Sequence, residues 1–347
     1  YDNIYLKHDT GILNTIAGPS LEKVQKFKAI IHHLEKSKIK QQLMVIKPRP
    51  ATIEELAAVH HKQYISYIQE FTRDGGGLLE SYTVVSPDSY EVATYAAGGA
   101  IRATEAVMDG RVNSAFALVR PPGHHATSHQ AMGFCLFNNI AVSAKYALAA
   151  YGLERVAIID FDVHHGNGTQ EIFNDNPQVL YVSLHEFPGY PGSGSLEETG
   201  SGKAKGTKVN VPLGAGSSDS EYLQVFEQVI APVVRRFQPQ LILVSAGYDP
   251  HWADAIGRMN VTTSGFARIV SIVKRLAEEL CNSRLVFCLE GGYNDTALAT
   301  SVKATFDVLL GNTDIEDLLG EPPLRLFVPN INIAPLIQSI KRIHNLA

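Results

Sequence analysis

A carboxylate and an imidazole stand two residues apart directly after an apolar run, and this pairing could hold a metal ion. Asp162 and His164 follow the run 156–159. At the end of an extended strand, side chains two residues apart leave the same face. Carboxylate and imidazole groups on one face are typical ligands of a divalent metal. A turn that caps a helix with the same side chains is the alternative, because short motifs also match by chance.

Other apolar runs are also followed by side chains suited to catalysis or binding. His124 and His125 come after the run 115–119, in a segment whose prolines and glycine restrict the backbone. Histidine is matched to proton transfer near neutral pH, which favours an acid–base role over a surface turn with incidental histidines. The glycine–aromatic pair Gly133 and Phe134 either lines a pocket or packs at the start of a helix.

Two later apolar runs, 241–245 and 285–289, are followed by a carboxylate and by a phenol. Asp249 follows the run 241–245 and is either a third metal ligand or a helix cap. Tyr293 follows Gly291 and Gly292, two glycines that permit close approach of the backbone. Its hydroxyl could face a site, and a packed ring is the alternative.

Together these side chains favour metal-dependent hydrolysis of an amide or an ester. Three protein ligands with one open position is the arrangement of catalytic zinc. A metal held in this way polarises a carbonyl group and acidifies a bound water. A fixed histidine can accept the proton of the water, and a tyrosine hydroxyl can stabilise the oxyanion.

Short apolar runs alternate with helical patterns along the chain, which predicts an α/β fold with a mainly parallel sheet. The loop 185–208 is expected to be ordered and functional, because Phe187, Tyr190 and Pro191 lie within it. No linker divides the chain, so one domain over 1–347 is expected. Helices are predicted over 21–36, 52–71, 93–108, 138–151, 220–237 and 263–280.

The composition excludes several classes of protein. The 347 residues carry a net charge of −5 and no basic block, which argues against a nucleic-acid partner. No apolar stretch is as long as a membrane span, which needs about 18 residues. The N-terminus does not resemble a signal peptide. The three cysteines have no metal-binding spacing and favour a reducing compartment. A cytoplasmic location is expected, or an organellar one in a eukaryote, and not secretion.

These segments resemble the zinc-dependent histone deacetylase family, above all its class II branch and the bacterial histone deacetylase-like amidohydrolases. The resemblance covers 86–311 and implies an arginase/deacetylase-like α/β domain with a central, mainly parallel, eight-stranded sheet and helices on both faces. The motifs that carry it are 120–126, 133–139, 160–168, 183–194, 247–249 and 290–294.

The resemblance assigns roles to the residues that match the motifs of the family. Asp162, His164 and Asp249 match the zinc ligands, although iron or manganese would also suit such a set. His125 matches the general base, and Tyr293 matches the tyrosine that stabilises the transition state. The resemblance therefore implies one catalytic zinc ion.

The resemblance also implies partners for these groups. His124 matches the neighbour of the base and would pair with Asp160. Asn167 stands where His125 would find an orienting partner; class I members carry Asp there, so His125 should be less strongly polarised in this chain. Structural potassium is implied beside the zinc, at a site matched by Asp160, Asp162, His164, Ser183 and Leu184.

A narrow tunnel for an acetyl-lysine side chain is implied as well. Its substrate-binding residues are matched by Gly133, Phe134, Tyr190, Gly291, Gly292 and Ile256. Ile256 lies close to the place of a glutamate in polyamine-specific relatives, and an apolar residue there argues against a polyamine substrate. The segment 12–19 lacks the His-Pro-Glu sequence of relatives, and Asp88 is shifted from the acidic residue that grips the substrate backbone.

The expected function is hydrolysis of acetyl-lysine in a protein or peptide, or of a related acyl-amine, by a zinc-dependent deacylase. One alternative is an amidohydrolase for acetylpolyamines or other small molecules on the same fold. The other is a module that binds acyl-lysine with little turnover. No membrane partner is expected, and an oligomer is left open.

Overall fold

The structure is a computed structural model that describes residues 1–13, 21–322 and 332–347. Its centre is a six-stranded sheet with the order β3-β8-β7-β4-β5-β6, in which every neighbouring pair is parallel. The strands are β3 (Ser114–Ala117), β4 (Val156–Asp160), β5 (Val179–Glu186), β6 (Lys208–Leu213), β7 (Leu241–Ala246) and β8 (Leu285–Leu289).

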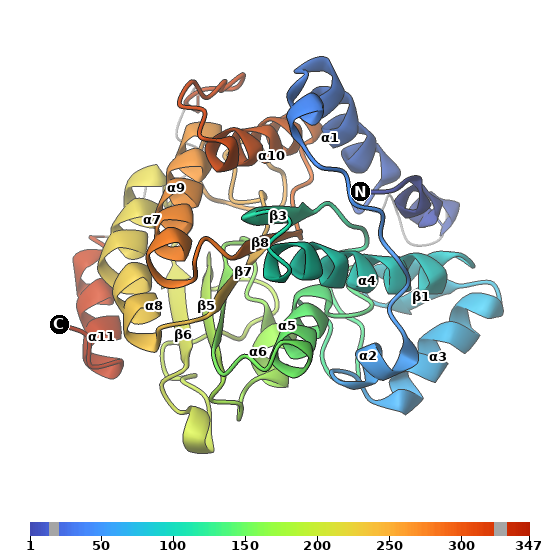
Figure 1. Ribbon diagram of the computed structural model, residues 1–347, viewed down its shortest axis with the longest axis horizontal. Helices are drawn as coiled ribbons and strands as arrows, with labels where there is room; N and C mark the ends of the chain where they lie inside the picture. The colour runs from blue at the N-terminus through green and yellow to red at the C-terminus, as the bar shows by residue number, and fades with distance from the viewer. Residues whose placement is uncertain (14–20, 323–331) are drawn as a thin grey trace.

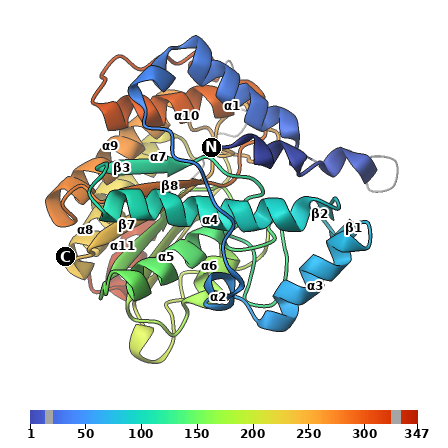
Figure 2. The same ribbon diagram turned by 45° about the vertical axis from the view of Figure 1, so that its right-hand side comes forward.

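Helices cover both faces of this sheet, as the alternating sequence pattern predicts (Figures 1 and 2). One face carries α4 (Ser89–Met108), α5 (Asn139–Ala150) and α6 (Asn167–Ile172). The other carries α7 (Asp219–Val225), α8 (Ala231–Phe237), α9 (Thr263–Leu280) and α10 (Asp295–Leu310). Peripheral helices pack outside these layers: α1 (Val24–Lys36) on α10, α2 (Ile53–Ala57) on α5, α3 (Lys62–Arg73) on α4, and α11 (Ala334–Ile343) on 226–230.

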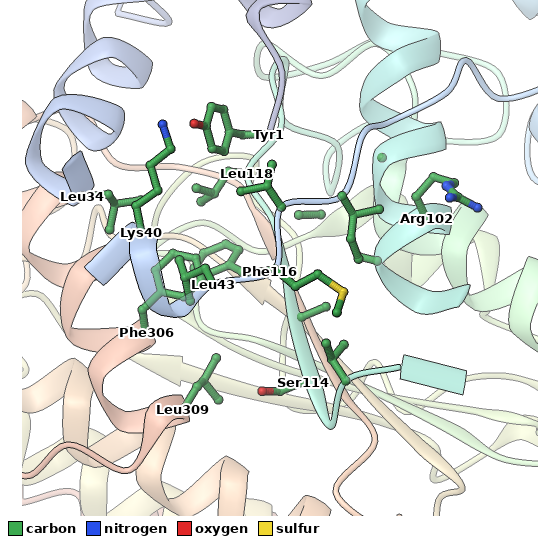
Figure 3. Close-up of a pocket in the computed structure, with 18 of the residues that line it drawn as sticks. Tyr1, Leu34, Lys40, Leu43, Arg102, Ser114, Phe116, Leu118, Phe306 and Leu309 are labelled. Atoms are coloured by element: carbon green, nitrogen blue, oxygen red, sulfur yellow. The ribbon is translucent and has the colours of Figure 1, made fainter. Parts of the chain in front are cut away.

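Within the described residues the central sheet has six strands rather than the expected eight. In the described residues the other two strands, β1 (Gly77–Glu80) and β2 (Thr83–Val85), form a separate antiparallel hairpin. The apolar segment 43–48 does not join the free edge of β3, and its last residue, Pro48, has no N–H to donate to a ladder. An apolar pocket of about 320 Å³ is lined by this segment and by β3 (Figure 3).

Two predicted helices differ from the structure for local reasons. The sequence predicts one helix over 52–71, but the backbone N–H of His61 donates to Ser128 O and the chain starts again as α3. The predicted helix 220–237 is continuous and contains a π-helical turn, Phe226–Ile230, shortly before Pro232. Pro232 has no N–H, and π-turns are one way in which a helix accommodates such a break.

The predicted loop 185–208 is shorter at both ends. His185 and Glu186 belong to β5, and Lys208 begins β6, a strand that the sequence analysis does not predict. Helix α10 is also missing from the sequence prediction, although Asn294 caps it by accepting from the N–H groups of Thr296 and Ala297.

The arrangement of the buried strands positions the polar residues that follow them. Every residue of β4, β7 and β8 is buried, as in parallel strands covered on both faces. These three strands are neighbours, so their carboxyl ends meet at one edge of the sheet, where α/β folds place their chemistry. None of the helices in the described ranges combines the length and apolar character needed to cross a bilayer.

Candidate active site

The three predicted metal ligands lie together at the carboxyl ends of β4 and β7. One ligand atom from each of Asp162, His164 and Asp249 falls within 4.8 Å of the others. Asp162 and His164 follow β4, and Asp249 follows β7, its neighbour in the sheet. Asp162 and Asp249 are buried, and His164 is partly exposed. The structure therefore brings together the set that could hold a metal ion.

Backbone N–H groups orient the two carboxylates of this set. Asp162 Oδ2 accepts from Gly291 N at 2.9 Å, and Asp249 Oδ1 accepts from Val163 N at 2.9 Å. Asp249 Oδ2 is buried and has no hydrogen-bond partner among the described residues. Burial and then the charge of Asp162 raise the pKa of Asp249. An unpartnered buried oxygen beside a second carboxylate and an imidazole fits a divalent cation.

Two glycines allow the ligands to approach the backbone. A Cβ at Gly291 would overlap the carboxylates of Asp249 and Asp162, and a Cβ at Gly247 would overlap that of Asp162. Gly291 is predicted to bind substrate; its contacts in the structure are with the metal-ligand set, and the substrate-binding role stays a prediction. Gly247 is not assigned a role from the sequence, although it lies in the motif 247–249.

The two adjacent histidines have different hydrogen-bond partners. His124 Nδ1 lies 3.0 Å from Asp160 Oδ2, and His125 Nδ1 lies 2.9 Å from Asn167 Oδ1. Although burial lowers the pKa of His124, the charges of Asp160 and then Asp162 raise it to about 10. Burial, followed by the positive charges of its neighbours, holds the pKa of His125 well below its usual value. His124 is therefore a cation next to a neutral His125.

The amide of Asn167 fixes which nitrogen of His125 carries the proton. Because Asn167 Nδ2 donates to Met132 Sδ, its Oδ1 faces His125 and accepts from Nδ1–H. The lone pair of His125 then lies on Nε2. The centroid of the His125 ring is 5.8 Å from the centroid of the His164 ring. This tautomer leaves Nε2 able to accept a proton.

Aromatic rings surround the space beside these histidines. The ring of Tyr190 lies 5.1 Å from that of His125, and the ring of Phe134 lies 5.7 Å from that of Tyr293, centroid to centroid. A Cβ at Gly133 would overlap the ring of His125, so the absence of a side chain lets this wall approach the base. These predicted wall residues therefore lie together.

Tyr293 is held by groups that the sequence analysis missed. The buried Asp254 carboxylate accepts from Tyr293 N at 2.6 Å and from Ile256 N at 3.0 Å. Lys26, from the N-terminal part of the chain, also approaches Tyr293: its Nζ lies 4.6 Å from the centroid of the ring. Lys26 is buried and pairs with Glu22, with 2.7 Å between Nζ and Oε2. No spacing rule in the sequence connects residues 22–26 with Tyr293.

The remaining predicted residues are placed as follows. Ser183 is paired with Asp160 across β4 and β5, and Leu184 is the next residue of β5. Gly292 has a φ of +122°, and a Cβ there would meet Leu298 and Tyr248. Asp88 is exposed at the start of α4. The departure predicted over 12–19 lies largely outside the described residues.

The sequence profile of the histone deacetylase domain matches residues 20–309. The chain belongs to the histone deacetylase family. It is an enzyme of the deacetylase and amidohydrolase type, and its fold is that of the family.

Several relatives match over most of their length. The chain is 38% identical over 333 residues to "Histone deacetylase 14, chloroplastic" of Arabidopsis thaliana, covering 91% of this chain and 79% of that protein. It is 38% identical over 299 residues to the "Histone deacetylase-like amidohydrolase" of Pseudomonas aeruginosa, covering 85% and 77%. The crystal structure of the HDA15 HD domain superposes with a TM-score of 0.90 at 34% identity, over 99% of this chain and 92% of that one.

Proposed function

We propose that this family member is a zinc-dependent deacylase that hydrolyses the amide of acetylated lysine in a peptide or protein. The observation that carries the proposal is the unpartnered, buried Asp249 Oδ2, which lies 3.5 Å from His164 Nδ1 beside Asp162. Asp162, His164 and Asp249 would hold the zinc ion. Zinc bound there would polarise the acyl carbonyl and acidify a water.

The side chains around this set supply the acid–base chemistry. His125 Nε2 accepts the proton of the attacking water, because Asn167 holds the proton of the ring on Nδ1. The protonated His125 then gives this proton to the nitrogen of the leaving amine as the C–N bond breaks. The cationic His124, paired with Asp160, adds positive charge next to the base. Tyr293 donates a hydrogen bond from its hydroxyl to the developing oxyanion and keeps the proton, because burial raises the pKa of the phenol well above its usual value.

The aromatic walls support a slender, extended substrate. Phe134 and Tyr190 flank the approach to His125, and Gly133 adds no side chain to narrow it further. A lysine side chain offers a row of methylene groups that such rings can pack against. Ile256, held by Asp254 near Tyr293, provides no carboxylate for a polyamine cation.

Potassium would bind beside the catalytic set. Asp160 stands opposite Ser183 in the sheet. The segments 160–164 and 183–184 are therefore neighbours, and both offer oxygens, from carboxylates and from the backbone. Oxygen ligands of this kind suit a hard monovalent cation. The cation would offset the negative charge of the buried Asp160 and Asp162.

The test is hydrolysis by the purified protein before and after chelation and return of zinc. The substrates are an acetyl-lysine peptide and acetylputrescine, and bound metal is measured in each sample. Peptide hydrolysis that is lost on chelation and restored by zinc is expected. Faster hydrolysis of acetylputrescine would favour a small-molecule amidohydrolase, and zinc binding without turnover of either compound would favour an acyl-lysine binding module.

A further inference from the structure

Lys208 is a fully buried lysine that has no role in the chemistry described above. It is the first residue of β6, and its side chain is 0% exposed. No carboxylate in the described part of the chain lies within ion-pair distance of its Nζ. A buried ammonium group normally requires a charged partner or a full set of acceptors, so the surroundings of Nζ call for an explanation.

Four neutral oxygens surround this ammonium group. Lys208 Nζ lies 2.9 Å from Val179 O and 2.7 Å from Thr207 Oγ1. The carbonyl oxygens of Asn176 and Thr207 each lie 3.5 Å away. We call these four atoms the oxygen cage. The cage joins the turn that follows α6 to the start of β6.

Every oxygen of the cage is placed to accept and none to donate. Three of the four are backbone carbonyls, which have no proton to give. The fourth, the Thr207 hydroxyl, donates its own proton to Ala204 O at 2.7 Å and therefore presents a lone pair to Nζ. Burial lowers the pKa of Lys208 to about 7, and the charge of Asp175 opposes this shift. The acceptors favour the ammonium form, because a neutral amine would direct a lone pair at one of these oxygens, whereas an ammonium group has only donors.

The fold leaves room for the side chain of Lys208 to reach the cage. A Cβ at Gly200 would lie 3.1 Å from Lys208 Cγ and closer still to Ala204 O. Gly200 has a φ of +90°, a conformation that favours glycine. Gly200 thus provides both the turn and the space for the buried side chain of Lys208.

We infer that the oxygen cage is a monovalent-cation site whose resident cation is the ammonium group of Lys208. Converging backbone carbonyls are the ligands by which proteins hold potassium. An ammonium ion has a similar size and charge, and here the chain carries it covalently. Because the cation is tethered, this part of the fold needs no ion from solution.

The site follows directly after an element that carries a predicted catalytic residue. Asn167 is the first residue of α6, and Asn176 and Val179 lie in the turn and strand that follow this helix. The Lys208 cation therefore fixes the chain between α6 and β5. This inference concerns stability and does not depend on the proposed deacylase activity.

The test replaces the lysine and supplies the cation from solution. In Lys208→Ala, the cage keeps its oxygens and loses its cation. Thermal unfolding is followed in choline chloride, potassium chloride and ammonium chloride at one ionic strength, with wild type beside it. We expect the midpoint of the variant to be lower than that of wild type by about 5 °C in choline chloride, and potassium or ammonium to close most of this gap with saturation.

Lys208→Met is the matched control, because its apolar chain fills the space without a charge. Its gap to wild type should stay open in every salt. The proposed potassium site at Asp160 is present in all three proteins, so its response cancels in the difference from wild type. A gap in Lys208→Ala that no small cation narrows would overturn the inference.

A second variant applies if Lys208→Ala does not fold. Thr207→Val keeps the lysine and removes one oxygen of the cage, and its unfolding midpoint should fall below that of wild type. Thr207→Ser retains the hydroxyl and should restore most of the loss. Equal stability of Thr207→Val and wild type would show that the cage does not hold a cation.

Discussion

The two histidines beside the metal-ligand set differ in pKa: burial and the charge of His124 lower the pKa of His125, whereas Asp160 raises the pKa of His124 against the effect of burial. Asp160 gives His124 a carboxylate, and Asn167 gives His125 a neutral amide oxygen. A neighbouring carboxylate favours the protonated imidazole, and an amide does so only weakly. One ring is thus available as a base while the next supplies positive charge.

Replacing Asn167 by Asp should move the pH dependence of activity. The new carboxylate favours the protonated form of His125 and so raises its pKa. Because the base must be neutral to act, the acid limb of the profile of kcat/KM against pH should shift to higher pH. Asn167→Ala should lower activity without that upward shift, and an unmoved limb in Asn167→Asp would remove Asn167 from contact with the base.

Tyr293→Phe should separate metal binding from turnover. The substitution removes the hydroxyl that would stabilise the oxyanion but leaves Asp162, His164 and Asp249 intact. Losing one such donor typically lowers kcat by about 100-fold or more. Metal content and kcat are measured on the same sample, and a fully active Tyr293→Phe protein would exclude Tyr293 from the reaction.

The buried Lys26 should affect turnover through Tyr293. Its Nζ lies 4.6 Å from the centroid of the ring, and the positive charge favours negative charge developing near the hydroxyl. Lys26→Met keeps the length of the side chain, and kcat should fall by about 3- to 30-fold, the range of a desolvated cation–π contact. KM and the unfolding midpoint are measured in parallel.

Two controls separate this charge effect from damage to the Glu22 pair. Lys26→Arg keeps the charge, and the unfolding midpoint of Lys26→Met reports damage to the buried cluster that Glu22 forms with Lys26 and Arg120. A loss of kcat that Lys26→Arg recovers supports the electrostatic role. A fall in stability with unchanged kcat would leave Lys26 with a purely structural role.

At the scale of elements, the β1–β2 hairpin holds Gly133 and Phe134, which would form one wall of the proposed substrate tunnel. Thr83 Oγ1 accepts from Phe134 N at 3.0 Å, and Glu80 Oε1 accepts from Gly133 N at 3.2 Å. Phe134 has a φ of +70°, a conformation that a non-glycine residue keeps only when its surroundings hold it. The hairpin provides those surroundings from a part of the chain that lies about fifty residues earlier.

Thr83→Val should therefore weaken substrate binding more than chemistry. The variant leaves Phe134 N without its acceptor, and the wall relaxes while His125 and the metal ligands stay in place. KM for an acetyl-lysine peptide should rise by about five-fold, the size of one hydrogen bond, with kcat nearly unchanged. Thr83→Ser retains the hydroxyl as a control, and a fall in kcat at constant KM would contradict this role.

At the scale of the molecule, metal binding should stabilise the fold. Asp162 and Asp249 are buried together, and without a cation their like charges oppose the compact state. Zinc bound only by the folded chain stabilises it by about 4 kcal/mol at a thousand times its dissociation constant. The unfolding midpoint should fall on chelation and recover with zinc.

Asp249→Asn tests that the effect arises at this site. It removes one charged ligand and one like charge, so the apo protein should gain stability while its midpoint becomes much less sensitive to zinc. An equal response to zinc in the variant and in wild type would place the metal elsewhere.

The sequence by itself determined what local spacing can encode. Asp162 and His164 lie two residues apart after a buried run, and this period of two sends both side chains to one face. Unbroken apolar runs predict the buried strands β4, β7 and β8, and parallel strands bring their ends to one edge. The α/β class and the pairing of Asp162 with His164 follow from these features, whereas the resemblance to the family singled out Asp249 as the third ligand.

Only the tertiary structure decided which distant residues support those groups. Lys26 and Asp254 approach Tyr293 from separate segments, and the oxygen cage brings the turn 176–179 to Lys208. Neither contact has a period or a motif, because it depends on how helices and loops pack rather than on neighbours in the chain. Tertiary structure also decided which strands join the central sheet, because an apolar run does not by itself specify whether a segment pairs with the edge of a sheet.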